Sequence, residues 1–277
     1  MNKALDYNGL LEAHKNKKLL KKHIHFPLWA EIKYDGNYVS VKVENGHVTF
    51  ITSGNLTYTH TDAHPFSTLS EGVYLAERIH GEGKLGDRVR CNLTGPKNNQ
   101  KSTGHNYVVH DWLPINDWIE GYTIIDYSSR VLNIPKDHSP AGTMIFSHPE
   151  LDEFLKTVCN QGYEGLMLKQ HDWKWKRTSS RTVELCKYKN RRTADLLCIA
   201  TTEGEGKYVG KIGALVLQDS VGRIVSVGSG LSDTDRAKAP RTYIDKVIEI
   251  EYEQIIDTYI QPAFIQVRSD KDALHID

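Results

Sequence analysis

The sequence of 277 residues has few cysteines, and they lie far apart, at positions 91, 159, 186 and 198. No two of them form a C-x-x-C pair, so the spacing of a zinc site is absent. A chain of this size also has little need of a disulfide framework. We therefore expect reduced thiols, as in a cytosolic protein.

The sequence also lacks the segments that direct a chain to a membrane. No apolar run approaches the ~20 residues that a bilayer-spanning helix needs. The first residues, Met1–Tyr7, do not contain the apolar core of a signal peptide. We expect no membrane partner, and a protein that stays in the compartment where it is made.

Net charge is absent as well, because 35 basic residues balance 35 acidic ones. Any contact with nucleic acid must therefore come from local clusters. Lysines gather in the predicted helix over residues 8–24, which is either a solvated face or a contact for a phosphate backbone. A second cluster is basic and aromatic and suits a DNA backbone, although Trp173 and Trp175 would equally fit a core, on alternating sides. Its cations are Lys174, Lys176, Arg177, Arg181, Arg191 and Arg192.

Short strands dominate the secondary structure that the sequence predicts. Up to residue 193 we expect a strand that ends near Lys33, strands at 38–43, 48–52, 72–78, 106–112 and 183–189, and a turn followed by a strand within 162–169. Helices are expected near 127–132 and 150–159. After residue 193, short strands at 195–201, 212–218, 223–229 and 246–252 alternate with glycine turns, which is typical of a small β-barrel. The predicted domains are therefore 1–193 and 194–277.

Two glycine–lysine stretches, Gly81–Lys84 and Gly204–Lys207, bear a superficial likeness to phosphate-binding loops. Neither has the four-residue spacer, or the Ser or Thr after the lysine, that a P-loop uses to bind phosphate and magnesium. We interpret both as ordinary turns. The sequence thus argues against a P-loop NTPase.

The stretch Glu31–Gly36 places a lysine, Lys33, at the end of a predicted strand among apolar neighbours. An amine held in a pocket with a lowered pKa can attack an electrophile. Alternatively, Asp35 and Gly36 are only the turn of a solvated hairpin. The short pattern K-x-D-G does not decide between these interpretations by itself.

An ordered series of motifs follows this lysine along the chain. After Lys33-x-Asp35-Gly36 come Glu77, Glu164-Gly165, Lys187-x-Lys189 and finally Arg268-Ser269-Asp270-Lys271. In this order, from about residue 30 to residue 271, the chain resembles the covalent nucleotidyltransferases, and most closely the small phage-type ATP-dependent DNA ligases. The resemblance implies an α+β fold: a nucleotidyltransferase domain of ATP-grasp-like antiparallel sheets with helices, followed by a C-terminal OB-fold β-barrel.

The resemblance also implies an activity, the sealing of nicks in duplex DNA during replication or repair. Lys33 would be adenylylated, AMP would pass to the 5′-phosphate, and the 3′-hydroxyl would then attack. ATP and Mg²⁺ would be the cofactors and nicked double-stranded DNA the partner of a monomer, in the cytoplasm of a bacterium or of a phage-infected host cell. The alternatives are an RNA ligase or capping-type guanylyltransferase, and a non-catalytic nucleic-acid-binding module.

The chemistry explains the residue types in the series. A free lysine has a pKa near ~10.4, and nearby cations (Lys187, Lys189 and magnesium) would lower that of Lys33. The same cations would neutralise charge on the phosphates. Glu77 and Glu164 carry the oxygen ligands that magnesium prefers, and either could instead bind the ribose. By resemblance, Glu77 takes the ribose, Glu164 the metal, Glu31 and Ile32 lie beside the adenine, His110 stacks on it, and Arg268 and Lys271 meet the leaving phosphates.

Three positions depart from the pattern of the family. Tyr38 stands where an arginine is expected, Thr52–Asn55 replaces a Ser-Arg turn, and His110 replaces the phenylalanine that stacks on adenine. A histidine ring can stack, but it offers less apolar area than phenylalanine. The two missing arginines remove phosphate-directed charge, for which Arg78, Arg88 and Arg90 are the candidate replacements.

Overall fold

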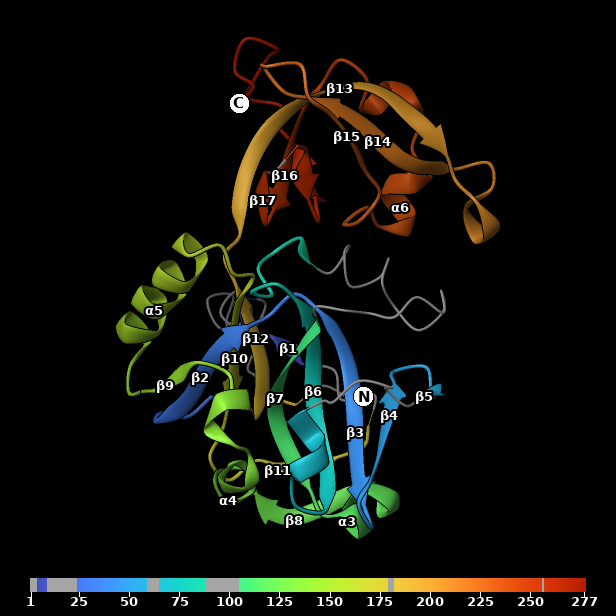
Figure 1. Ribbon diagram of the computed structural model, residues 1–277. Helices are drawn as coiled ribbons and strands as arrows, with labels where there is room; N and C mark the ends of the chain where they lie inside the picture. The colour runs from blue at the N-terminus through green and yellow to red at the C-terminus, as the bar shows by residue number, and fades with distance from the viewer. Residues whose placement is uncertain (1–3, 9–23, 59–64, 88–104, 179–181, 256) are drawn as a thin grey trace. The chain divides into compact units, whose positions relative to one another are not determined.

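The computed structural model describes residues 4–8, 24–58, 65–87, 105–178, 182–255 and 257–277 (Figure 1). The chain divides into two compact units, Met1–Lys189 and Asn190–Asp277. The division precedes the expected boundary at 193/194, because strand β13 (Arg192–Glu203) pairs with β16 (Val247–Tyr252) from Arg192 onward. Except for its two end residues, the predicted helix over 8–24 lies outside the described residues. Arg88, Arg90 and Arg181 also lie outside them.

The first sheet of the first unit has the strand order β1-β12-β10-β2-β9. Its strands are β1 (Leu5–Asp6), β2 (Leu28–Lys33), β9 (Gly142–Ile145), β10 (Gly165–Lys169) and β12 (Leu185–Lys189). Gly165 of β10 lies opposite Lys33 on one side and opposite Lys189 on the other. This register brings Lys33, Lys189 and the residue before Gly165, which is Glu164, to one end of the sheet.

The second sheet of the first unit has the order β5-β4-β3-β6-β7. Its strands are β3 (Asn37–Glu44), β4 (His47–Thr52), β5 (Thr57–Tyr58), β6 (Gly72–His80) and β7 (His105–Leu113). Asn45 and Gly46 join β3 to β4 with φ angles of 50° and 75°, the left-handed conformations of a tight hairpin turn. The strands predicted for this region are confirmed, and β3 and β4 pair as a hairpin.

The two faces of the first sheet differ in character because successive side chains of a strand alternate. Leu28, Ala30 and Ile32 of β2 face a core that helix α5 (His148–Asn160) covers with Leu151, Leu155 and Val158. Figure 1 shows α5 beside β9, β2 and β10. Glu31 and Lys33 therefore face the other side, toward the pocket described below.

The remaining elements of the first unit are short. The helices are α3 (Ile115–Glu120) and α4 (Tyr127–Arg130), with 3-10 turns at Pro65–Thr68, Val131–Asn133 and Lys136–His138. Together, α4, the turn after it and α5 confirm the two predicted helices. Strands β8 (Tyr122–Asp126) and β11 (Lys174–Lys176) form a two-stranded sheet that the sequence did not predict.

The second unit is built on one antiparallel sheet with the order β15-β14-β13-β16-β19. Besides β13 and β16 it contains β14 (Ile212–Gln218), β15 (Ile224–Val227) and β19 (Ala263–Val267). Leu196, Leu215 and Ile250 belong to its own apolar core. The smaller elements are α6 (Asp233–Arg236), the ribbon of β17 (Gln254–Ile255) and β18 (Tyr259–Ile260), and 3-10 turns at Gly206–Tyr208 and Pro240–Thr242.

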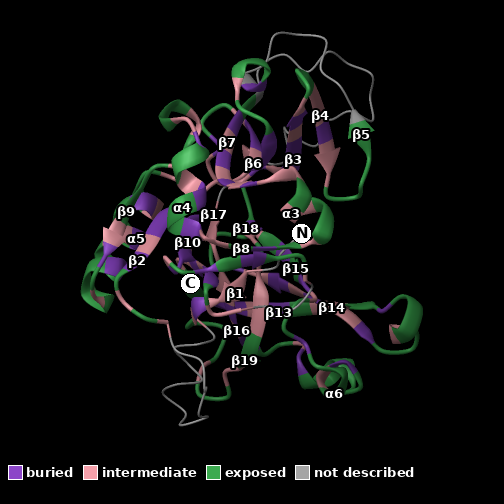
Figure 2. Ribbon diagram, turned by 90° about the horizontal axis from the view of Figure 1, so that it is seen from below, coloured by how far each residue is buried: buried purple, intermediate pink, exposed green. Residues whose placement is uncertain are grey.

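Buried residues run along the inner strands of the first unit, such as β6 and β10, whereas no residue of α3 is buried (Figure 2). Within the described ranges, no helix is both long enough and apolar enough to cross a membrane.

Candidate active site

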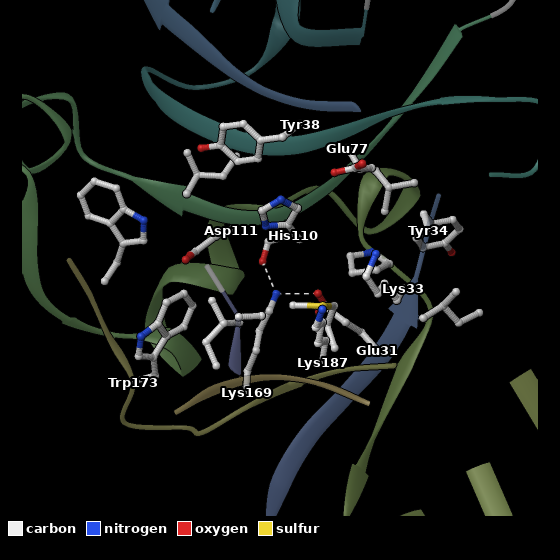
Figure 3. A pocket seen from close by; sticks show the side chains of 18 residues that line it. Glu31, Lys33, Tyr34, Tyr38, Glu77, His110, Asp111, Lys169, Trp173 and Lys187 are labelled. Atoms are coloured by element: carbon white, nitrogen blue, oxygen red, sulfur yellow. Dashed lines mark hydrogen bonds and ion pairs between the residues drawn. The ribbon is translucent and has the colours of Figure 1, made fainter. Parts of the chain in front are cut away.

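A pocket of about 340 Å³ opens between the two five-stranded sheets of the first unit (Figure 3). That volume lies in the usual range for a small-molecule site. Its wall includes six of the residues predicted for nucleotide binding: Glu31, Ile32, Lys33, Glu77, His110 and Lys187. The fold thus brings together residues that lie far apart in the sequence.

Lys33, at the end of β2, forms an ion pair with Glu164, and Lys189 pairs with the other oxygen of the same carboxylate. Glu164 is buried, and burial by itself would raise the pKa of its carboxyl group. The two lysines prevail and hold the pKa of Glu164 below its ordinary value of 4.5. The side chain of Lys33 is 24% exposed and lines the pocket.

Two glycines permit the close contacts around Lys33. A Cβ on Gly165, whose φ is 150°, would lie 2.3 Å from the carbonyl oxygen of Tyr188. A Cβ on Gly36 would lie 2.3 Å from the carbonyl oxygen of Arg78 and 2.9 Å from Cγ of Glu77. Asp35 accepts a hydrogen bond from the Gly86 N–H at 2.8 Å. Asp35 and Gly36 therefore form a structural turn directly after Lys33, and the nucleophilic role of Lys33 stays a prediction.

Lys187 lies two residues before Lys189 on β12, so both side chains are on the same face of that strand. Lys187 lines the pocket. Burial, with the charges of Lys189 and Lys33 nearby, lowers the pKa of Lys187. Its ammonium group adds positive charge where the sequence predicts the phosphates.

At another part of the pocket wall, Glu31 is buried and paired with Lys169, with 2.5 Å between Glu31 Oε1 and Lys169 Nζ. Glu31 Oε2 accepts hydrogen bonds from Trp29 Nε1 and from the Tyr127 hydroxyl, both at 3.2 Å. Burial raises the pKa of Glu31, and Lys169 opposes that shift. Ile32 touches the pocket, but its side chain belongs to the core behind the sheet.

His110 and Tyr38 form an aromatic part of the wall, with ring centroids 6.1 Å apart. Burial and the nearby Lys169 charge lower the pKa of His110 to about 3, so its ring is neutral at physiological pH. The Tyr38 hydroxyl hydrogen-bonds to Ser40 Oγ at 2.9 Å, and burial raises the pKa of Tyr38 to about 12. Tyr38 therefore supplies a ring in place of the expected arginine charge.

The charge of that missing arginine is not replaced by Arg78. Arg78 is buried, and it is not among the residues that line the pocket. In the part of the chain that the structure describes, the cations of the pocket wall are Lys33, Lys169 and Lys187.

The carboxylates of the site suit a magnesium ion that takes most of its ligands from the substrate and from water. No group of three or more His, Cys, Asp or Glu side chains that could hold a metal occurs among the described residues. Magnesium bound with nucleotides commonly takes only one or two carboxylates from the protein. Glu164, next to Lys33, and Glu77, in the pocket wall, are residues of that kind.

Arg268 and Lys271 belong to the second unit, where both contact the carboxylate of Asp195. Arg268 Nη1 lies 3.2 Å and Lys271 Nζ 2.5 Å from Asp195 Oδ2. Arg268 also pairs with Asp270, with 2.7 Å between Nη2 and Oδ2. The cations predicted to meet the leaving phosphates are therefore paired with carboxylates of their own unit.

The basic, aromatic cluster divides between two faces and two units. Trp173 and Trp175 are both buried and both line the pocket, so they share one side rather than alternating. Lys174 and Lys176 are exposed on the opposite side of β11. Arg177 stacks on Trp118, 4.9 Å from the ring centroid. In the second unit, Arg192 is exposed and Arg191 pairs with Glu251 at 2.6 Å.

Two buried cations of the first unit, Lys169 and Arg130, were not predicted as part of the site from the sequence. Arg130 is fully buried and forms two hydrogen bonds of 2.9 Å with the carboxylate of Asp111. The available signal was the position of Lys169 at the end of the apolar run Leu166–Leu168. A lysine that ends a buried strand needs an acidic partner, but the sequence does not show which one.

Comparison with known proteins agrees with this architecture. Residues 203–268 match the model of a family described as the DNA ligase OB-like domain. The structure named Pmar-Lig_PreS3 is similar with a TM-score of 0.74 and 19% identity, over 96% of this chain and 67% of that one. A structure from work on Lig E DNA ligases is similar with a TM-score of 0.72 and 20% identity, over 97% of this chain and 98% of that one. No curated protein matches the sequence.

The chain therefore combines a first unit that holds the pocket with a C-terminal stretch, residues 203–268, that matches an OB-like domain. The chain has the fold of the DNA ligases. The resemblance and the fold class predicted from the motifs are thereby confirmed.

Proposed function

We propose that this protein is an ATP-dependent DNA ligase that seals nicks in duplex DNA through a covalent lysine–AMP intermediate. The observation that carries the proposal is the placement of Lys33, whose amine lies at a nucleotide-sized pocket beside Glu164, Lys187 and Lys189. A DNA ligase needs a lysine nucleophile among groups that balance phosphate charge, and this arrangement provides both.

In the first step, Lys33 Nζ attacks the α-phosphorus of ATP. An N–P bond forms, the bond from the α-phosphorus to the bridging oxygen breaks, and pyrophosphate leaves. The attacking amine must be deprotonated, so Lys33 has to lose its proton and leave its ion pair with Glu164. Lys187 and Lys189 then offset the negative charge that the phosphates bring.

In the later steps, the 5′-phosphate of a nick takes AMP from Lys33, and the 3′-hydroxyl attacks the activated 5′-phosphate and releases AMP. Glu77, in the pocket wall, would bind the ribose, and neutral His110 would stack on the base. Arg268 and Lys271 would orient the leaving pyrophosphate after exchanging Asp195 for phosphate oxygens.

Magnesium would be held by Glu164, with Glu77 as a second candidate, and would supply Lewis-acid polarisation of the phosphate oxygens. The exposed Lys174 and Lys176 would contact the phosphate backbone of DNA, together with Arg192. Arg177 and Arg191, already engaged with Trp118 and Glu251, would contribute less.

The decisive experiment incubates the protein with magnesium and α-labelled ATP or GTP and then adds nicked DNA or nicked RNA. We expect ATP to label the protein and nicked DNA to be sealed. Lys33→Arg keeps the positive charge but removes the nucleophile, and should abolish the label. Lys42→Arg changes another lysine of the first unit, one that pairs with Glu44, and should be labelled like the wild type.

The rival functions give different results in the same experiment. A guanylylated adduct would indicate a capping-type enzyme, and sealing of nicked RNA alone would indicate an RNA ligase. A protein that binds nucleic acid but forms no adduct on Lys33 would be the non-catalytic module.

A further inference from the structure

The glycine–lysine stretch that follows β6 forms a defined turn, the Gly81–Asp87 loop. Gly83 and Gly86 have φ angles of 70° and 96°, left-handed conformations that favour glycine. The Lys84 N–H donates to the Asp87 carboxylate at 2.9 Å within the loop. The interpretation of Gly81–Lys84 as a turn is therefore confirmed, but the proposed function has so far given its lysine no role.

This loop is tied to the turn that follows Lys33. The carbonyl oxygen of Gly83 accepts a hydrogen bond from the Asp35 N–H at 3.0 Å, and the Gly86 N–H donates to the Asp35 carboxylate. A Cβ on Gly83 would lie 2.9 Å from Cδ1 of Tyr34, the residue next to Lys33. The backbone of the loop is thus fixed beside the predicted nucleophile.

The same loop is tied to the turn that precedes Glu164. The Leu85 N–H donates to the carbonyl oxygen of Gly162 at 3.0 Å. A Cβ on Gly162 would lie 3.5 Å from Cδ of Lys84, so the aliphatic stem of this lysine crosses the turn. Lys84 therefore lies next to the end of the first sheet where Glu164 forms its ion pairs.

The ammonium group of Lys84 has an exposed and exchangeable partner. Its Nζ lies 2.7 Å from Oε2 of Glu82, and the two side chains are 44% and 69% exposed. An ion pair as exposed as this contributes little to stability, so a phosphate can take the place of the carboxylate. Lys84 is not among the residues that line the pocket. Its charge is therefore directed to a group outside the nucleotide site.

The ligase reaction brings a second phosphate to Lys33, the 5′-phosphate of the nick. It must approach the anionic AMP from outside the pocket, because the nucleotide fills the inside. The described cations of the wall are already committed: Lys33 carries the AMP and Lys169 pairs with Glu31. Lys187 meets the phosphates of ATP. A cation at the outer edge is needed to offset the repulsion between the two phosphates.

We propose that Lys84 binds the 5′-phosphate of the nick and orients it toward the AMP on Lys33. The inference rests on the proposed ligase function and adds a residue that acts on its second substrate. An oxygen of the bound phosphate forms a bond to the phosphorus of AMP. The N–P bond to Lys33 breaks, and the departing amine takes up a proton.

The test compares wild type, Lys84→Met, Lys84→Arg and Glu82→Gln on two nicked duplexes, which differ only in a 5′-phosphate or a 5′-hydroxyl at the nick. A 3′-deoxy end on the other side of the nick prevents sealing. Affinity is measured by fluorescence anisotropy without ATP, and AMP transfer from the isolated Lys33 adduct in a single turnover. Lys42→Met is the matched control, because Lys42 also pairs with a glutamate two residues away at 2.7 Å.

We expect Lys84→Met to keep the stem across Gly162 and to weaken binding of the 5′-phosphate nick by about tenfold. Binding of the 5′-hydroxyl nick should not change, and AMP transfer should slow by a similar factor. Lys84→Arg should restore the preference for the phosphate, and Glu82→Gln should strengthen it, since a competing carboxylate is gone. Lys42→Met should behave like the wild type.

Equal losses of Lys84→Met on both nicks, or no loss on either, would overturn the proposal. Slower formation of the Lys33 adduct from ATP in Lys84→Met would also overturn it, because the residue would then act on the first substrate. Failure of the proposed function gives a separate result. A wild type that forms no adduct refutes the ligase chemistry, while the affinities for the two nicks still judge Lys84. A wild type that forms the adduct but binds both nicks equally refutes the role of Lys84 alone.

Discussion

The two units hold their charged motifs in different ways. In the first unit, buried Glu164 is shared by Lys33 and Lys189, with Lys187 close by, so cations outnumber the anion. We expect the lysines around Glu164 to be available to a phosphate at the pocket.

In the second unit, the half-exposed Arg268 and Lys271 share Asp195, and Arg268 also pairs with Asp270. With Glu249, whose Oε2 lies 3.9 Å from Arg268 Nη1, the carboxylates there outnumber the cations. The first arrangement is therefore ready for a phosphate, whereas the second must exchange a carboxylate for one.

The largest expected effect concerns the stability of the buried charges of the first unit. The side chains of Arg130 and Asp111 are 0% and 1% exposed. Arg130→Met leaves the buried Asp111 carboxylate without its partner and should lower the free energy of unfolding by about 3–5 kcal/mol. All five tryptophans lie in the first unit, so their fluorescence during urea unfolding reports on that unit. Arg268→Met, followed by circular dichroism, should cost much less because its pairs are partly solvated. Equal losses would remove the contrast between the units.

A second effect concerns the shared anion. Glu164→Gln leaves Lys33 and Lys189 beside each other without a carboxylate and removes the candidate metal ligand. The rate of adduct formation on Lys33 in a single turnover should fall by about 10²-fold. Glu153→Gln, an exposed position on α5, is the control and should keep the wild-type rate. A Glu164→Gln variant with normal kinetics would show that the shared pair has no catalytic role.

The pH dependence of stability provides a smaller effect. Because the folded-state pKa of Glu164 lies below its ordinary 4.5, its ion pairs contribute stability above that value and lose it as the pH falls through the folded-state pKa. The difference in unfolding free energy between wild type and Glu164→Gln should be constant above about pH 5 and shrink toward lower pH. Urea titrations from pH 3 to pH 7 measure it. A difference that grows on acidification would have the wrong sign.

The smallest effect concerns the second unit. Asp195→Asn removes the carboxylate that Arg268 and Lys271 share. If these cations meet DNA phosphates, the slope of log K against log salt for nicked DNA should become steeper by up to ~0.9. Glu205→Gln removes an exposed charge from the same unit and should leave the slope as it is. Identical slopes for both variants would show that Asp195 does not compete with phosphate.

Local patterns in the sequence predicted most of the sheet strands. The hairpin at Asn45-Gly46 needs left-handed backbone angles that asparagine and glycine adopt readily, so the Asn-Gly pair in the sequence indicates a turn there. Strands β9 and β11 were missed because they are short and take their places by pairing with β2 and β8. The alternative that Trp173 and Trp175 are core residues is confirmed, but they do not lie on alternating sides, because residues two apart on a strand share a face.

The sequence alone determined which residues form the motifs and in which order they occur, starting from Lys33 in K-x-D-G. Such motifs are local patterns, so they can be identified without the fold. Only the tertiary structure decided how the charges are paired. Glu164 meets Lys33 through the register of β10 against β2, and Lys169 reaches both Glu31 and His110 because the two sheets face each other. Ion pairs between distant residues depend on strand register and sheet packing, which are properties of the whole fold and leave no local pattern in the sequence.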